Sequence, residues 1–304
     1  MVSLCLLAPG VVPCFNLFMR NPLNKIWFGL KNADQVADKI WKNIVPQFIY
    51  KMVGKFYLIP ENIKRRLYPV SAVPIEKKGK HKTIVDNYWG EHTVYSDEFE
   101  SAYQSRKYLE WRAKEYPKFI ELMELYGDHE GETILDYGCG PANDSVGFAL
   151  WSNAKKIIGI DVSSKALKIA QHRLWLHRLS PERIRLIKSS DSSYKIPLKD
   201  ESVNYIYSEG VIHHTSNQSG ILKEFYRILQ HGGVTAIMVY NYDSVWVHLY
   251  VAYLQMIKEK AYPDNFTVRQ VFTKTSDGPN CPIADCYKPA EFEKMGRDAG
   301  FKTE

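Results

Sequence analysis

The sequence predicts an α/β fold, in which a parallel β-sheet carries helices on both faces and follows an N-terminal helical extension. The chain has 304 residues, 45% of them hydrophobic and 24% charged, which suits a globular protein with a sizeable core. From residue 131 onward, short apolar runs alternate with helix-length stretches. Strands separated by helices require crossover connections, and these favour parallel pairing.

The formal net charge of +6 is unevenly distributed along the chain. Residues 1–85 contain 14 Lys and Arg against 4 Asp and Glu, a net charge of +10, whereas residues 86–304 contain 26 against 30, a net charge of −4. Such a shift predicts two parts with different surfaces. Because segment 69–83 is rich in Pro, Gly and Lys, we assign residues 1–85 to a basic helical extension and linker, and residues 86–304 to the domain that carries the chemistry.

The first nineteen residues are apolar, but Pro9, Gly10 and Pro13 interrupt a stretch that barely reaches the ~20 residues of a membrane-spanning helix. A secretory signal would begin with basic residues, which are missing here. Two interpretations stay open: a peripheral membrane contact through residues 1–66, or an apolar arm packed on the protein itself or on a partner. Residues 25–67 carry apolar side chains at three- and four-residue steps, which predicts one or two amphipathic helices.

Cysteine usage points to a reducing, cytoplasmic environment. The chain has five cysteines, an odd number in a chain long enough to form a core without disulfides. Cys281 and Cys286 have the spacing of half a metal site, but no cluster of His and Cys completes four ligands in the sequence. We therefore expect no metal.

The elements of the domain follow from the periodicity of apolar residues. A helical stretch rich in aromatic residues, 95–125, precedes the first strand. The predicted strands are residues 133–138, 156–161, 184–189, 203–208 and 234–241, and the predicted helices are residues 144–152, 163–177 and 218–229. Parallel sheets of this kind bind ligands at the carboxyl ends of their strands, so we expect the functional site there.

The first strand ends in Asp136-Tyr137-Gly138-Cys139-Gly140-Pro141-Ala142-Asn143-Asp144, and a helix follows. Small residues allow a sharp turn and a close approach to a ligand, and free N–H groups at the start of a helix bind anions. The third glycine of a dinucleotide-binding loop is missing, and no Lys or Arg lies between residues 138 and 147. The loop therefore favours a ligand whose anion is a single carboxylate over one with phosphates.

Carboxylates follow the next two strands. Asp161 ends the second strand, where an acid accepts hydrogen bonds from a ribose diol, although a role at the helix start is the alternative. Ser190-Asp191-Ser192 follows the third strand, where a carboxylate can accept from an exocyclic amine or simply stabilise a turn. Together with the loop, these groups describe a nucleoside joined to an amino acid.

Three runs, ILDYGCGPANDSVG, IIGIDVSSKALKIA and SSDSSYKIPLKDESVNYIYSEGVIHHTSNQSGILKEFYRILQHGGVTAIMVYN, resemble the class I S-adenosylmethionine-dependent methyltransferases, within the small-molecule branch called type 11. The resemblance covers about residues 131–241. It implies a Rossmann-like sheet, S-adenosyl-L-methionine as cofactor and S-adenosyl-L-homocysteine as product. The cofactor-binding residues that it implies are Asp136, Gly138, Cys139, Gly140, Asp161, Val162, Ser190, Asp191, Ser192, Ser208, Glu209 and Gly210.

The C-terminal part departs from the family pattern. The last residues fit a helix and the opening of a sixth strand, but the usual seventh strand is missing from the sequence. We expect either truncated C-terminal strands or a sheet that ends differently, with its edge covered. An aromatic insertion at about residues 242–285 matches a position where the family commonly carries a substrate cap.

His213 and His214, which directly follow the fourth strand, are the candidate catalytic residues. A histidine near its ordinary pKa of about 6.5 can take a proton from the methyl acceptor, or else the pair only shapes the pocket or caps a helix. Aromatic residues are candidates for covering the site from both sides. They are Tyr88, Trp89, Tyr95, Tyr103, Tyr108 and Trp111 before the first strand, and Tyr242, Trp246, His248, Tyr250 and Tyr253 in the insertion.

These features predict a methyltransferase that acts on an O, N or C atom of a small-molecule acceptor. Methyl transfer from a sulfonium is an in-line displacement that mainly needs alignment and exclusion of water. Two alternatives remain. One is a tRNA-modifying enzyme that uses the basic N-terminal segment, although the acidic domain makes nucleic acid the less favoured partner. The other is a non-catalytic cofactor-binding protein.

Overall fold

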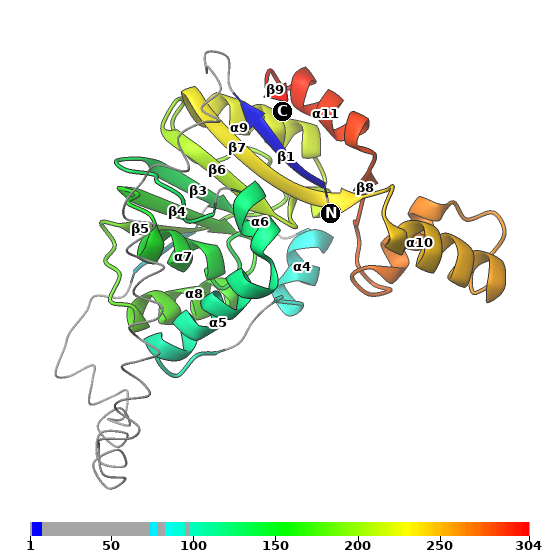
Figure 1. Cartoon of the computed structure of the whole chain (residues 1–304), viewed down its shortest axis with the longest axis horizontal. Helices are drawn as coiled ribbons and strands as arrows, with labels where there is room; N and C mark the ends of the chain where they lie inside the picture. Colours follow the sequence, from blue (N-terminus) through cyan, green and yellow to red (C-terminus); the bar gives the residue numbers. More distant parts are fainter. Residues whose placement is uncertain (1, 8–72, 78–82, 95–97, 124, 304) are drawn as a thin grey trace, which may run out of the picture. The chain divides into compact units, whose positions relative to one another are not determined.

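A computed structural model describes residues 2–7, 73–77, 83–94, 98–123 and 125–303 (Figure 1). The chain divides into two compact units, one comprising Met1–Val11 and Ser71–Glu304 and the other Val12–Val70. The helices predicted for residues 25–67 lie outside the described residues, as does Tyr95.

A largely parallel sheet forms the centre of this unit (Figure 1). From one edge to the other, the strands are β2 (Ile75–Lys77), β5 (Ile184–Lys188), β4 (Lys156–Asp161), β3 (Thr133–Tyr137), β6 (Val203–Glu209), β7 (Leu229–Asn241), β1 (Val2–Leu7) and β9 (Lys302–Thr303). Pairing is parallel from β2 to β7 and antiparallel on both sides of β1. The short strand β8 (Cys286–Tyr287) adds to the end of β7. This arrangement confirms the predicted Rossmann-like fold class.

Four of the five predicted strands agree with the structure to within a residue, but β7 is longer than predicted. It begins at Leu229, which pairs with Val203, and its register then shifts before Tyr205 pairs with Val234. Gly232 has a φ of +83° at this irregularity. The predicted strand 234–241 is therefore only the C-terminal part of β7, and the Gly-rich residues before it lie at this irregularity.

The two faces of the sheet pack against different helices, because successive strand residues point to opposite sides. One buried cluster joins the sheet to α7 (Asn143–Trp151) and α8 (Ser164–Leu176), and the other joins it to α9 (Gln218–Ile228) and α11 (Pro289–Asp298). Ile157 belongs to the first cluster and its neighbour Ile158 to the second. Figure 1 shows α7 and α8 on the side of the sheet away from α9 and α11. The layers match the predicted helices 144–152, 163–177 and 218–229.

The N-terminal strand β1 changes two expectations from the sequence. Its register with β7 runs from Val2 opposite Val239 to Leu7 opposite Val234. Residues 2–7 thus lie in the sheet, as an arm packed on the protein itself, rather than in a helical extension. They pair with the edge of β7 for which the sequence predicted no further complete strand. The sheet therefore ends differently from the family pattern.

The predicted boundary at residues 85 and 86 also differs from the observed one. Within the expected linker, Ile75 pairs with Leu186 and β2 extends the sheet. Next come α4 (Ile84–Glu91), α5 (Ala102–Glu115) and α6 (Pro117–Leu122), of which the last two fall within the predicted helical stretch 95–125. The start of α4 is fixed by a capping box between Thr83 and Asp86.

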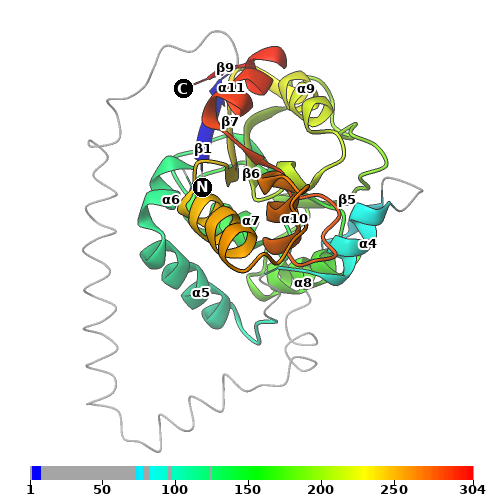
Figure 2. The same ribbon diagram turned by 90° about the vertical axis from the view of Figure 1, so that its right-hand side faces the viewer.

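The insertion after β7 contains the π-helical segment η2 (Trp246–Lys258) and the helix α10 (Val268–Thr275). They pack on each other through Val247, Val251 and Phe272. In Figure 1 the insertion extends beyond the end of β8. In Figure 2, which is turned by 90°, the insertion faces the viewer. Within the described residues, no helix combines the length and apolar character needed to cross a membrane.

Candidate active site

A cavity of about 290 Å³ lies at the carboxyl ends of the central strands. Its walls come from the loop after β3, the starts of the segments after β4 and β5, the end of β6, and α4. More distant elements complete it: Arg112 from α5, residues 238–240 from the end of β7, and Asp277 from the insertion. The cavity is therefore at the sheet edge where the sequence placed the site.

The loop after β3 is held in a strained, close-packed conformation. Gly138 has a φ of +81°, and a Cβ on it would stand 2.1 Å from a methyl carbon of Val211, so a side chain there meets both strain and a clash. The N–H groups of Gly138 and Cys139 donate to the carbonyl of Ile160 at 2.8 and 3.0 Å. Ala142, with a φ of +62°, starts α7. The loop thus folds back onto β4 and leaves its outer face to the cavity.

Asp161 joins this loop to the start of α8. Its carboxylate accepts hydrogen bonds from the N–H of Gly140 at 2.8 Å and of Ser163 at 2.6 Å. Burial raises the pKa of Asp161, and these backbone hydrogen bonds oppose the rise. Gly140 itself has a φ of +50°, and no atom lies within 4 Å of the position that a Cβ would take. The backbone at Gly140 therefore offers an open surface beside a buried carboxylate.

Asp136 is a buried acid at the end of β3. Its side chain is 3% exposed and accepts a hydrogen bond of 2.5 Å from the Ser145 hydroxyl. Burial, reinforced by the nearby charge of Asp144, raises the pKa of Asp136 to about 8. The carboxyl group is therefore mostly protonated at neutral pH.

Arg112 is a buried cation that bridges two acids in the cavity wall. Its guanidinium forms ion pairs with Asp144 at the start of α7 and Glu209 at the end of β6. The Tyr207 hydroxyl contacts the same two carboxylates, at 3.0 and 2.8 Å. Burial raises the pKa of Glu209 to about 7. No local sequence signal marked Arg112, because its partners come from elements that only the folded sheet brings together.

The segment after β5 is tied to α4. The carboxylate of Asp86 accepts from the Ser190 hydroxyl and from the Asp191 N–H, the latter at 2.8 Å. The Asp191 carboxylate in turn accepts from the backbone N–H of Ser216 at 3.0 Å. Asp86, which the sequence did not single out, thus fastens α4 over this end of the cavity.

Most of the cofactor residues that the resemblance implied line the cavity: Asp136, Gly138, Cys139, Gly140, Asp161, Val162, Ser190, Asp191, Glu209 and Gly210. Two of them do not. Ser192 is exposed and contacts Ser190, and Ser208 is fully buried with its hydroxyl donating to the carbonyl of Tyr137 at 3.1 Å. Alternate strand residues point away from the cavity, which explains the position of Ser208.

The two candidate catalytic histidines also line the cavity, in the short helix η1 (Ile212–His214). The Nδ1 atom of His214 is 2.7 Å from the carbonyl oxygen of Ile283, which can only accept, so Nδ1 carries the proton and Nε2 the lone pair. Burial lowers the pKa of His214 and keeps the ring neutral at pH 7. Its Nε2 lies 3.8 Å from a carboxylate oxygen of Asp277.

His213 lines the cavity but makes no side-chain hydrogen bond to the described residues. It is 1% exposed, and its ring lies against His214 and Tyr240, with centroids 4.1 and 4.2 Å apart. Neither ring nitrogen has a hydrogen-bond partner among the described residues. Burial lowers the pKa of His213 far below its ordinary value. These observations make His214 the better proton acceptor of the pair.

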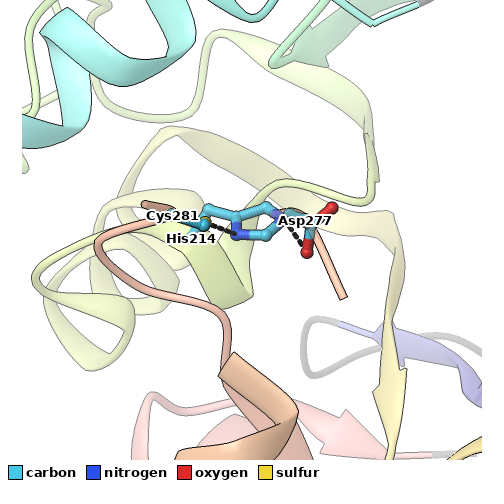
Figure 3. Close-up of side chains that lie close together, drawn as sticks. All are labelled: His214, Asp277 and Cys281. Atoms are coloured by element: carbon cyan, nitrogen blue, oxygen red, sulfur yellow. Dashed lines mark hydrogen bonds and ion pairs between the residues drawn. The ribbon is translucent and has the colours of Figure 1, made fainter. Parts of the chain in front are cut away.

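His214, Asp277 and Cys281 form a group whose ligand atoms lie within 4.8 Å of one another. Figure 3 shows that Asp277 and Cys281 lie at opposite edges of the His214 ring. The Cys281 sulfur is 4.0 Å from Nδ1, the nitrogen that already carries the proton. Because an imidazole offers a single lone pair, a cation on Nε2 would have Asp277 beside it but not Cys281. We therefore assign no metal to this group.

The aromatic cover of the cavity is smaller than predicted. Trp89 lines it, with its ring 4.6 Å from that of His214. Tyr103 and Trp111 are instead 64% and 49% exposed. In the insertion, none of the predicted aromatic residues lines the cavity, and Trp246 is 47% exposed. The sequence pattern missed Asp277, which is the side chain that the insertion contributes.

A family model described as a methyltransferase domain matches residues 128–293. The match covers more than half of the chain, so the chain belongs to this family of class I S-adenosylmethionine-dependent methyltransferases. The family and cofactor implied by the resemblance are confirmed.

The relatives match the chain over its central part. A sterol 24-C-methyltransferase from Pneumocystis carinii is 29% identical over 122 residues, covering 39% of this chain and 31% of the relative. A demethylmenaquinone methyltransferase from Listeria welshimeri is 23% identical over 164 residues, covering 53% of this chain and 65% of the relative. A solved putative methyltransferase from Bacillus halodurans aligns with a TM-score of 0.45 and 19% identity, over 62% of this chain and 70% of the other. The matches span 31% and 65% of the lengths of the two curated relatives.

Proposed function

We propose that the protein transfers a methyl group from S-adenosyl-L-methionine to a small-molecule acceptor held in the 290 Å³ cavity. The observation that carries the proposal is the open backbone at Gly140 next to the buried carboxylate of Asp161, with no atom within 4 Å of where a glycine Cβ would stand. When bound, the cofactor supplies an electrophilic methyl group on a sulfonium. The chain's residues bind it, align it and exclude water.

Each end of the cofactor has fitting partners in the cavity. We assign the ribose to Asp161 and the adenine to the segment around Asp191, whose carboxylate would exchange its hydrogen bond to Ser216 for one from the ligand. We assign the amino-acid end to Arg112, which would exchange part of its ion pairing with Asp144 and Glu209 for the ligand carboxylate, and to Asp136, which accepts from an ammonium once deprotonated. Arg112 supplies the cation that the loop after β3 lacks.

The acceptor side is formed by His214, Trp89, Tyr240 and Asp277. A small molecule suits this enclosed place better than a nucleic acid, since Arg112 is the one Lys or Arg among the described lining residues. A membrane contact remains a proposal for residues 8–66, which lie outside the described part of the chain. It would bring an apolar acceptor to the domain from a lipid surface.

Binding of S-adenosyl-L-homocysteine to Asp161→Asn tests the cofactor assignment. The amide keeps the shape of the side chain but removes the charge and one acceptor from the ribose, so we expect dissociation constants at least about tenfold higher than for the unchanged protein. Isothermal titration calorimetry measures the affinity, and the melting temperature reports whether the loop stays folded.

The matched control is Asp264→Asn, which changes an exposed acid outside the cavity and should leave the affinity within twofold. If the unchanged protein gives no heat with S-adenosyl-L-homocysteine and no thermal shift, the proposed function is wrong. Equal affinities for Asp161→Asn and the control would instead reject the role of Asp161.

A further inference from the structure

Two hydrogen-bond acceptors face the cavity side by side at its acceptor end. The proton of His214 is on Nδ1, which donates to Ile283, so its Nε2 presents a lone pair. The nearest carboxylate oxygen of Asp277 is 3.8 Å away, too far for a direct hydrogen bond. No hydrogen bond reaches Nε2 from any residue that the structure describes. The gap between the two atoms therefore fits a ligand group with two donors.

The length of the gap sets the geometry of such a group. A nitrogen about 2.9 Å from each acceptor is at ordinary hydrogen-bond distance and fits across 3.8 Å at the apex of a triangle. An ammonium or amine has the two N–H donors that this requires. A hydroxyl has one, and would leave either Nε2 or the carboxylate facing the ligand without a donor.

Charge favours a cation at the same place. The described lining residues include six carboxyl groups, Asp136, Asp144, Asp161, Asp191, Glu209 and Asp277, against the single guanidinium of Arg112. Burial keeps Asp136 mostly protonated and raises the pKa of Glu209 to about 7, but the remaining acids still outnumber the one cation. Arg112 is already paired with Asp144 and Glu209. The Asp277 carboxylate receives the Tyr240 hydroxyl, at 3.1 and 3.3 Å, but no cationic Lys or Arg partner among the described residues. Its charge is therefore available to a ligand.

The walls around this gap are aromatic. Trp89 lies against His214 with ring centroids 4.6 Å apart, and Tyr240 lies against His213. Faces of indole and phenol rings attract cations and keep out water. The opposite edge of the His214 ring is closed by Ile283 and Cys281, so a ligand reaches the ring only at Nε2.

Resting on the proposed function, we infer that the methyl acceptor is a primary or secondary amine, which enters as an ammonium and donates to both Asp277 and Nε2 of His214. His214 takes one proton from the ammonium and leaves a neutral amine. The amine nitrogen then forms a bond to the methyl carbon while the carbon–sulfur bond breaks with its electron pair on sulfur. The products are the methylated ammonium and S-adenosyl-L-homocysteine, and the proton on His214 returns to solvent.

Binding of matched amines and alcohols to the full chain saturated with S-adenosyl-L-homocysteine tests this inference. The probes are benzylamine with benzyl alcohol, butylamine with butanol, and tryptamine with tryptophol, titrated at pH 7.5. We expect at least one amine to bind about tenfold or more tighter than its alcohol. In Asp277→Asn this preference should fall to within about twofold. In His214→Gln an amine should still bind but its methylation should fall at least about a hundredfold.

The control variant is Asp264→Asn, which removes an exposed charge from the same insertion outside the cavity. It should keep the preference for amines. A panel in which no amine binds better than its alcohol, or a preference that survives in Asp277→Asn, would overturn the inference. So would a stoichiometric metal ion in the purified protein that is lost in Cys281→Ser. If the unchanged protein does not bind S-adenosyl-L-homocysteine, the proposed function on which this inference rests is wrong instead.

Discussion

At the scale of single residues, the two glycines of the loop after β3 have different constraints. Both have a positive φ, +81° for Gly138 and +50° for Gly140, but only Gly138 packs against Val211. We expect Gly138→Ala to lower the free energy of unfolding by about 2–4 kcal/mol, from backbone strain together with overpacking. Gly140→Ala carries only the strain, about 1–2 kcal/mol. Denaturant unfolding of both variants measures the difference.

The pair also separates folding from binding. A Cβ on Gly140 would enter open space beside Asp161, so Gly140→Ala should weaken S-adenosyl-L-homocysteine binding more than its small loss of stability suggests. If Gly140→Ala proves the more destabilising of the two, Gly138 does not pack tightly against Val211.

At the scale of elements, the sequence predicts what depends on local pattern. The apolar runs at β3, β4, β5 and β6 and the loop between β3 and α7 are each encoded within about ten consecutive residues, so their positions agree with the structure. The cross-links between elements are not encoded in this way. Arg112, Asp86 and Asp277 reach the cavity from α5, α4 and the insertion. Their partners lie between about 30 and 100 residues away in the chain, and only packing brings them together.

The strand β1 likewise could not be predicted from local sequence pattern. Val2–Leu7 is a six-residue strand whose apolar pattern also suits an anchor or an arm. Its partner β7 lies far along the sequence, and pairing between such distant segments leaves no mark on local periodicity. Likewise, the aromatic residues of the insertion have a helical pattern that does not say which face meets the cavity.

The attachment of α4 gives a prediction at this scale. Asp86→Ala removes the acceptor for the Ser190 hydroxyl, for the Asp191 N–H and for the Thr83 N–H of the capping box, and leaving buried donors unsatisfied costs about 1–3 kcal/mol each. We expect hydrogen exchange in residues 84–91 to accelerate at least about tenfold while the strands β3 and β4 keep their protection. Glu91→Ala, at the exposed end of the same helix, should change exchange there by less than twofold. Uniform acceleration across the domain would show that Asp86 supports the whole fold and not α4 alone.

At the scale of the whole molecule, buried ionisable groups set how stability varies with pH. His177, whose pKa burial lowers to about 4, is neutral when folded, whereas in the unfolded chain it gains a proton below about pH 6.5. Stability is therefore lost as the pH falls through this window. Asp136 behaves oppositely, since burial raises its pKa to about 8. The folded protein holds a proton that the unfolded chain releases above about pH 4, so stability from this group falls as the pH rises toward 8.

Between pH 6.5 and 8, only the carboxyl effect remains, because His177 is then neutral in both states. Asp136, and Glu209 with a pKa near 7, should make the melting temperature of the cofactor-free protein decrease across this interval. Asp136→Asn keeps the acceptor for the Ser145 hydroxyl but has no proton to lose, so the decrease should become clearly smaller. A melting temperature that is constant or rises from pH 6.5 to 8 in the unchanged protein would contradict the burial of a protonated Asp136. If the decrease is the same with and without the substitution, the carboxyl group responsible is not that of Asp136.

In the proposed complex, the cofactor's ammonium next to Asp136 favours the ionised acid. Saturation with S-adenosyl-L-homocysteine should therefore flatten the same decrease, which links the stability of the whole domain to the charge at the amino-acid end of its cavity.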